Sequence, residues 1–164
     1  MRALAGCLVT SLLLAVPFQV SSQEMTQEQE ASIQAEVMAF ADAWVEVWEE
    51  NDCETAAAFL PPDRLQFMWA GSFLSRSDWM GECSRVLETR AGFTGQMLDG
   101  EGTVLTPQAA FITLTLEQHY TYTDGSTRHY PRSAQMGLVE LTESGWVFTT
   151  FGNNNGPFET GQEG

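Results

Sequence analysis

Residues 119–130 read HYTYTDGSTRHY, and the loop at their centre decides how the C-terminal half of the chain folds. Asp124-Gly125 is a turn signal between two segments in which apolar and polar residues alternate, a pattern that predicts an antiparallel hairpin. A two-residue loop pairs Tyr120 with His129 and puts the two histidines of the chain on opposite faces of the sheet. A three-residue loop pairs His119 directly with His129.

The hydrophobic pattern of the flanking strands favours the three-residue loop, Thr123–Gly125, with the glycine left-handed at a bulge. In that register Ile112 lies opposite Met136 and Leu114 lies opposite Ala134, so apolar side chains share one face. Register follows the burial of one apolar face, and the sequence therefore predicts this loop.

Pro131 is the weak point of this register, because proline cannot donate to a strand ladder and could mark a second bulge. On the predicted register both histidines lie on the polar face of the sheet, beside Glu117. A metal site would need a third ligand. We therefore expect the pair to be a surface or subunit-contact feature and predict no metal site.

The even-numbered face of the same strands passes from apolar residues to polar and aromatic ones, which is typical of a small-molecule pocket. Arg132 is the least ordinary member, because arginine is rarely buried without a partner. Tryptophans of the first helix and first strand could close the pocket. The predicted ligand-binding residues are Trp44, Trp48, Trp69, Gln118, Tyr120, Tyr130 and Arg132, with Tyr122 and Arg128 on the same face.

Composition restricts the partners of the chain. Its 164 residues suffice for one domain with a real core, and 43% of them are hydrophobic, which argues against disorder. The net charge is −15, and the seven basic residues are all arginine. Nucleic acids and anionic membrane surfaces require a basic protein surface, so we expect neither as a partner.

The N-terminus has the pattern of a signal peptide over residues 1–22: Arg2, then an apolar run, then small residues at Val20-Ser21-Ser22. We therefore predict a secreted or periplasmic protein. Removal of this segment leaves Cys53 and Cys83, which allow one disulfide in an oxidising compartment. Two buried, unpaired thiols are the alternative.

Helix and strand signals predict an α+β domain over residues 25–152. A capping box at Thr26 starts a long helix, and Asn51-Asp52 ends it. Four strands in the second half form a meander, which gives a curved antiparallel sheet wrapped on three N-terminal helices with a cone-shaped pocket. The predicted helices span about 27–50 and 53–60, and a third is capped by Ser75 or Ser77 and runs to about residue 90. The predicted strands span 65–73, 96–105, 109–122, 127–141 and 146–151, and residues 153–164 form a flexible tail.

The order and motifs of these elements resemble the SnoaL-like, nuclear-transport-factor-2-like superfamily. The matching motifs are Phe40–Trp44, Asn51-Asp52, Ala56–Leu60, Ser77–Trp79 and Glu143–Phe148, and the resemblance covers about residues 25–152. It implies a conical pocket. The superfamily holds isomerases, cyclases, dehydratases and binding or assembly domains, so the fold alone does not select a function.

From the pocket face and the export signal, we predict an exported domain that binds a small hydrophobic or anionic molecule, without a cofactor. An isomerase, cyclase or dehydratase of the same fold is the alternative, and so is a dimeric assembly module. Catalysis would need an acid or base in the cavity. Glu140 is the only strand carboxylate on the predicted inner face, and no catalytic residue can be assigned.

Overall fold

The first helix, α1 (Gln27–Val47), begins at the predicted capping box. Gln29 N donates to Thr26 Oγ1, and Thr26 N donates to Gln29 Oε1. Val37, Ala41 and Trp44 recur at helical spacing on its buried face. The helix tightens into the 3₁₀ turn η1 (Trp48–Glu50) and ends at Asn51 in the left-handed conformation, with φ of 57°.

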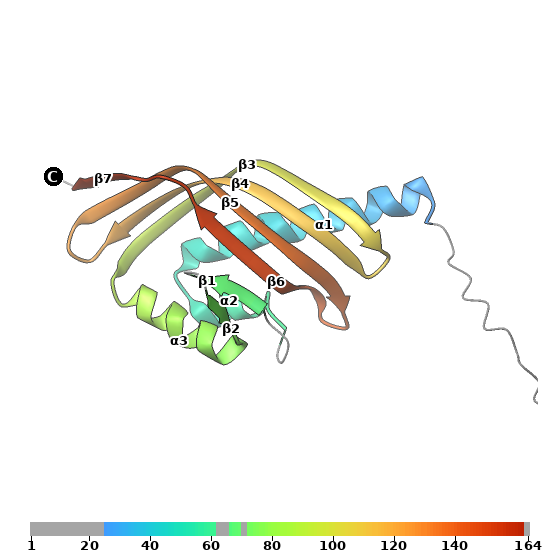
Figure 1. Cartoon of the computed structure of the whole chain (residues 1–164), viewed down its shortest axis with the longest axis horizontal. Coiled ribbons are helices and arrows are strands. Elements are labelled where there is room, and N and C mark those ends of the chain that lie inside the picture. The colour runs from blue at the N-terminus through green and yellow to red at the C-terminus, as the bar shows by residue number, and fades with distance from the viewer. Residues whose placement is uncertain (1–24, 62–65, 70–71, 163–164) are drawn as a thin grey trace, which may run out of the picture.

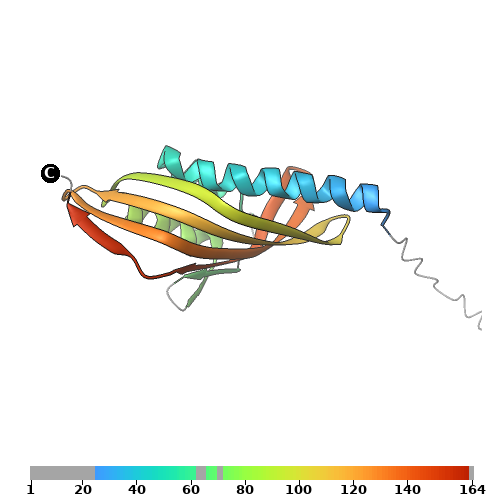
Figure 2. The same cartoon turned by 90° about the horizontal axis from the view of Figure 1, so that it is seen from above.

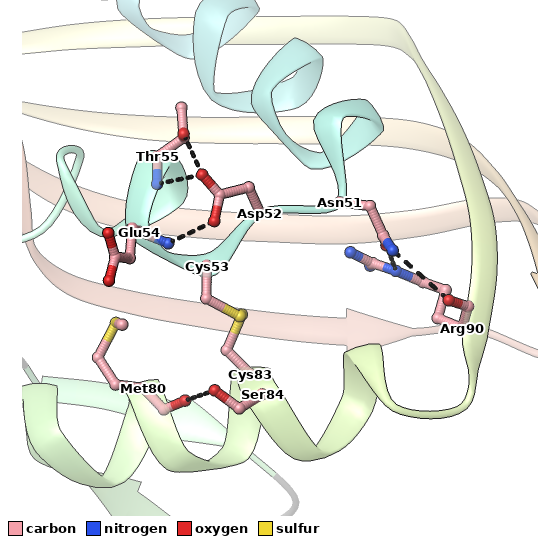
Figure 3. Close-up of a disulfide and its surroundings, with 9 residues drawn as sticks. All are labelled: Asn51, Asp52, Cys53, Glu54, Thr55, Met80, Cys83, Ser84 and Arg90. Carbon is pink, nitrogen blue, oxygen red and sulfur yellow. Dashed lines mark hydrogen bonds between the residues drawn. A yellow bond between two sulfur atoms is a disulfide. The ribbon is translucent and has the colours of Figure 1, made fainter.

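Two shorter helices follow in the computed structural model, which describes residues 25–61, 66–69 and 72–162. The second, α2 (Cys53–Ala57), is shorter than predicted, and α3 (Arg76–Leu87) begins after its cap Ser75 and ends before Arg90. A disulfide joins Cys53 of α2 to Cys83 of α3, with an S–S distance of 2.04 Å (Figure 3).

The helices lie on one face of a curved sheet, as predicted, and α1 runs lengthwise along it (Figures 1 and 2). The strands follow the order β2-β1-β6-β5-β4-β3, and β7 also pairs with β5. Their bounds are β1 (Gln66–Trp69), β2 (Ser72–Leu74), β3 (Arg90–Thr106), β4 (Ala109–Tyr122), β5 (Ser126–Thr142), β6 (Gly145–Asn155) and β7 (Glu159–Gln162).

The edges of the sheet differ from the prediction in three places. The first predicted strand is a hairpin of β1 and β2, and β1 pairs in parallel with β6. The third strand begins at Arg90 rather than Gln96. Residues 153–162 do not form the predicted flexible tail, because β6 continues to Asn155 and β7 pairs with β5 along Ser126–His129 (Figure 1).

The hairpin tip has the predicted three-residue loop. His119 pairs with His129, Thr121 pairs with Thr127, and Gly125 has a φ of 79°. Gly125 N donates to Tyr122 O at 3.0 Å and closes the turn. The prediction that the two histidines are neighbours is confirmed.

Beyond the tip the predicted register is wrong, and Pro131 is the reason. Pro131 and Arg132 of β5 together lie opposite Glu117 of β4, a bulge that shifts all later pairs by one residue. Ile112 therefore lies opposite Gly137 instead of Met136, and Leu114 lies opposite Gln135 instead of Ala134.

Because of this bulge, the residues of β5 after Arg132 point to the opposite face of the sheet from the one predicted. Ser133, Gln135 and Val139 are buried, whereas Met136 is 50% exposed and Arg132 points to solvent. Proline has no N–H to donate, so this strand changes partner around it: β7 pairs with β5 on the tip side and β6 on the other. No described helix combines the length and apolar character that crossing a membrane requires.

Candidate functional site

A cavity lies between the C-terminal end of α1, α3 and the inner face of the sheet. The volume of the cavity is about 80 Å³. Most of the wall is aromatic and apolar, and a few polar groups point into it, which is the usual composition of a ligand site. The aromatic members are Trp44, Trp48, Trp79, Phe93, Tyr120 and Phe151, and the polar members are Glu82, Arg90, Gln118, Gln135 and Asn153.

Arg90, the first residue of β3, is the charged group at the centre of this site. Only 4% of its surface is exposed. Its Nε donates to Asn51 Oδ1 at 2.7 Å, and Asn51 Nδ2 makes a longer contact of 3.5 Å to the Arg90 carbonyl oxygen (Figure 3). Asn51 can reach the arginine because α1 ends there. The end of the helix thus fixes the near side of the guanidinium.

The far side of the guanidinium has no polar partner. Its Nη2 is buried and forms no hydrogen bond, and among the described residues no carboxylate lies within 4.0 Å of it. Burial lowers the pKa of Arg90. Arginine nevertheless remains protonated in proteins, so the cavity contains a positive charge. The free edge of a guanidinium matches the two oxygens of a carboxylate.

Aromatic rings surround the same group. The Arg90 Cζ lies 5.5 Å from the ring centre of Trp48 and 5.6 Å from that of Phe93. Phe93 in turn packs edge-on against Tyr120, with ring centres 5.0 Å apart. Cation–π attraction of this kind offsets part of the cost of burying the charge. The rings also form the flat walls of the cavity.

Tyr120 supplies a neutral hydroxyl to the cavity. Burial raises the pKa of Tyr120 well above its usual range, although the Arg90 charge lowers it in part. The phenol therefore stays protonated near neutral pH and can donate a hydrogen bond. The Tyr120 hydroxyl and the Arg90 guanidinium are therefore two hydrogen-bond donors in the same cavity.

Two glutamines and an asparagine complete the polar lining. Ser133 Oγ donates to Gln118 Oε1 at 2.8 Å, and Trp44 Nε1 donates to Gln135 Oε1 at 3.2 Å. These contacts occupy both carbonyl oxygens and orient the amide groups. Asn153 Oδ1 is buried and accepts no hydrogen bond from the described residues. The cavity therefore also has one free acceptor.

The predicted ligand-binding residues separate into two groups. Trp44, Trp48, Gln118 and Tyr120 line the cavity. Tyr130 is buried elsewhere, between Tyr120 and Phe158, with ring centres 5.6 and 5.3 Å away. The bulge at Pro131 turns Arg132 to solvent, and the side chain of Trp69 lies outside the described part of the structure.

Sequence reasoning missed Arg90 because it placed this residue at the end of the third helix, where an exposed arginine is ordinary. Glu82, another cavity residue that was missed, lies on α3 beside Cys83. The available signal was Gly92-Phe93-Thr94-Gly95, where an aromatic and a β-branched residue favour an earlier strand start. Glu140 proves to lie on the outer face, because of the bulge in β5.

One group of three potential metal ligands occurs among the described residues, and it lies outside the cavity. Glu117, His119 and His129 gather on the other face of the sheet. Among the described residues that line the cavity, Glu82 is the only one with a carboxylate, and its two oxygens pair with Arg85. The cavity is therefore suited to hydrogen bonding and charge pairing rather than to holding a metal ion.

Comparisons by sequence give no relative: no family model matches, and neither does any curated protein. Solved structures do match. A proposed scytalone dehydratase from Novosphingobium aromaticivorans superposes with a TM-score of 0.73 at 9% identity, covering 85% of this chain and 93% of that one. A hexachlorocyclohexane dehydrochlorinase from Novosphingobium barchaimii has a TM-score of 0.68 at 8% identity, covering 82% and 94%.

A third match is a nuclear-transport-factor-2-like superfamily protein from Salmonella enterica. Its TM-score is 0.69 at 11% identity, covering 77% of this chain and 93% of that chain. Identities this low establish the fold and leave the activity undetermined. The chain therefore has the nuclear-transport-factor-2-like, or SnoaL-like, fold that its helix and strand motifs predicted.

Proposed function

We propose that the chain is an exported domain that binds a small carboxylate-bearing molecule in the cavity around Arg90. The observation that carries the proposal is the buried guanidinium, whose Nη2 forms no hydrogen bond in the described structure. Removing an unpaired charge from water costs several kcal/mol. A bound carboxylate offsets that cost with two parallel hydrogen bonds and an opposite charge.

The walls define the rest of the ligand. The cavity volume of about 80 Å³ is small compared with the roughly 300–1,000 Å³ of pockets that bind drug-sized molecules. Trp48, Phe93 and Tyr120 offer flat apolar surfaces next to the charge. The favoured ligand is accordingly a single aromatic ring or a short alkyl chain that carries one carboxylate.

Titrations with matched pairs of ligands test this proposal. Benzoate and hexanoate should quench the fluorescence of the cavity tryptophans and raise the melting temperature, whereas benzamide and hexanol should do neither. Arg90→Met should abolish carboxylate binding, and Arg90→Lys should retain part of it because lysine lacks the bidentate fork. Arg132→Met, which removes an exposed arginine, is the control and should bind as the wild type does.

The same variants report on stability, so a failure to fold cannot be mistaken for a loss of binding. Replacing a buried charge with an apolar side chain of similar size is often neutral or stabilising. We expect Arg90→Met to unfold at the same urea concentration as the wild type or at a higher one. Equal affinity for the acids and their neutral analogues, or unchanged binding by a folded Arg90→Met variant, would refute the carboxylate site.

Export rests on the N-terminal pattern alone, and residues 1–24 lie outside the described structure. Expression of the full chain in a bacterial host, followed by cell fractionation and N-terminal sequencing, tests it. A mature protein that begins at or near Gln23 outside the cytoplasm is the expected result. A full-length cytoplasmic product would contradict export.

An enzyme that eliminates or isomerises its ligand is the second candidate. Its support is that Glu82, whose carboxylate pairs with Arg85, and Tyr120, whose phenol is protonated, both line the cavity, and a base and a donor are what such reactions need. A proposed dehydratase from Streptomyces avermitilis and the dehydrochlorinase have this fold. Proton NMR of 3-hydroxyhexanoate, which can lose water to give the 2-enoate, tests for turnover over hours, and Glu82→Gln should abolish it.

A homodimer through the outer face of the sheet remains a prediction. Its support is the exposed apolar side chains of Met68, Phe111 and Met136, which are 44%, 37% and 50% exposed. Patches of this kind often mark contacts between proteins. Sedimentation velocity should show a dimer for the wild type and a monomer for Met136→Glu. A wild type that is monomeric at all concentrations would refute the dimer.

A further inference from the structure

The two histidines of the chain stack on each other on the outer face of the hairpin, away from the cavity. Their ring centres are 4.0 Å apart, and the planes differ by 6°. Glu117 lies on the same face, because it is two residues before His119 in β4. Its Oε1 lies 2.8 Å from His129 Nε2 and 3.3 Å from His119 Nε2. One carboxylate oxygen and two imidazole nitrogens thus converge.

The spacing suits a tetrahedral metal ion. Zinc–nitrogen and zinc–oxygen bonds of about 2.0–2.1 Å place neighbouring ligand atoms about 3.3 Å apart. The His119–Glu117 distance already has this value, and the three ligand atoms lie within 4.8 Å of one another. The rings must turn from their parallel stack to face one ion. The His119 side chain is 54% exposed and that of His129 is 30% exposed, so both have room to turn.

A further carboxylate lies behind the cluster. Glu159 of β7 places its Oε2 3.5 Å from His129 Nδ1, the ring nitrogen that faces away from Glu117. Metal-ligating histidines usually direct their second nitrogen to such a carboxylate, which fixes the ring and makes the first nitrogen a better ligand. β7 supplies this residue, and the sequence pattern alone did not reveal that strand.

The cluster is also open to solvent on one side. A surface hollow of about 200 Å³ adjoins it, lined by Thr94–Gln96, Glu117 and His119. An ion held by three protein ligands can therefore complete its coordination with water or with a small anion.

We propose that Glu117, His119 and His129 form a binding site for a divalent transition-metal ion, zinc or copper, with Glu159 positioning His129. Two imidazoles and one carboxylate are a ligand set for these ions, whereas magnesium and calcium take oxygen ligands. The site is separate from the cavity, because adjacent residues of β4 point to opposite faces of the sheet.

Isothermal titration of the untagged protein with Zn²⁺ at pH 7.5 tests the site, since a histidine tag would itself bind the metal. One equivalent of zinc per chain is expected, and Co²⁺ should give the visible absorption of a tetrahedral complex. His119→Gln, His129→Gln and Glu117→Gln should each weaken zinc binding at least about ten-fold, and Glu159→Gln should weaken it less. Glu101→Gln, an exposed carboxylate on the same sheet face, is the matched control and should leave the affinity unchanged.

Three results would overturn the site. One is the absence of saturable zinc binding by folded wild-type protein. Another is binding that survives in the His119→Gln/His129→Gln double variant, because the chain has no other histidine. The third is half an equivalent per chain, which would place the ion between two molecules. Arg90→Met should keep full zinc affinity, so failure of the carboxylate proposal leaves this one intact.

Discussion

Asn51 both ends the first helix and holds Arg90, and this pairing is the most informative feature at the scale of single residues. It is the only non-glycine residue of the described chain with a positive φ. Glycine is the usual choice at such a helix end, because it has no side chain to clash. The hydrogen bond from Arg90 Nε to Asn51 Oδ1 gives a reason for asparagine here.

Substitutions at Asn51 should change both stability and binding. Asn51→Gly relieves the strain of the left-handed φ but leaves the buried Arg90 Nε without its acceptor, so the free energy of unfolding should fall by about 1–3 kcal/mol. The guanidinium loses its anchor, so benzoate should bind about ten-fold more weakly, equivalent to about 1.4 kcal/mol. Asn51→Asp should also weaken binding, because its carboxylate competes for Arg90. Urea denaturation and fluorescence titration measure the two effects, and unchanged benzoate affinity in both variants would exclude Asn51 from the site.

At the scale of elements, the disulfide compensates for a very short helix. With five residues, α2 is too short to be stable alone. Asp52 caps it by accepting hydrogen bonds from the backbone of Glu54 and Thr55, and Cys53 ties it to α3 (Figure 3). Cys83 also lines the cavity, so the crosslink braces one wall of the site.

Loss of this disulfide should destabilise the fold markedly. The two cysteines are 30 residues apart, and closing a loop of that length in the unfolded chain is worth about 3–4 kcal/mol. A Cys53→Ala/Cys83→Ala double variant should lose about that much free energy of unfolding in urea. Dithiothreitol should lower the stability of the wild type and leave the double variant unaffected. A wild type that is insensitive to reductant would contradict the prediction.

The connection between β6 and β7 also has a strict steric requirement. A Cβ atom on Gly156 would lie 2.7 Å from the carbonyl oxygen of Arg132, which is backbone and cannot turn away. Gly156→Ala should therefore cost about 1–3 kcal/mol of stability. Gly81→Ala is the matched control: nothing lies within 4 Å of its Cβ in α3, so it should stabilise by about 0.5–1 kcal/mol. Equal melting temperatures for the two variants would show that the connection is not tightly packed.

At the scale of the whole molecule, the net charge of −15 and the helix caps respond to acid in opposite ways. Protonation relieves repulsion between carboxylates, which favours the folded state. The hydrogen bond from the Thr55 side chain lowers the pKa of Asp52, and that from Ser75 lowers the pKa of Asp78. A carboxyl with a lowered folded-state pKa stabilises the fold above its unfolded pKa, and this stabilisation disappears as the pH falls through the folded value.

The caps should therefore make the protein less stable below about pH 4, near the unfolded pKa of aspartate. Urea denaturation between pH 6 and 2.5 measures how the free energy of unfolding falls with pH. Asp52→Asn should make this fall smaller, because asparagine caps the helix without titrating. In 1 M salt the repulsion between carboxylates is screened, whereas the hydrogen bonds of the caps are not. The free energy of unfolding should therefore fall more steeply with decreasing pH in 1 M salt. Stability that rises steadily toward pH 2.5 in high salt would contradict this prediction.

Local chemistry alone determined a large part of this protein. The capping box at Thr26, the αL end of the helix at Asn51 and the loop at Gly125, which pairs His119 with His129, all follow from interactions within a few residues, although the apolar pairs from which the loop was predicted do not form. Each of these depends on hydrogen bonds or steric limits that a short sequence window contains. The α+β fold follows from the order of such elements.

Tertiary structure decided the site. Arg90 becomes a cavity residue only because α1 ends beside the start of β3, and Arg132 faces solvent instead of the cavity because of the bulge at Pro131. Glu159 reaches His129 only through a strand that forms by pairing with β5. Burial and pairing between distant segments carry no local signal, so the sequence predicted that there is a pocket, and only the packed structure assigned the charge inside it.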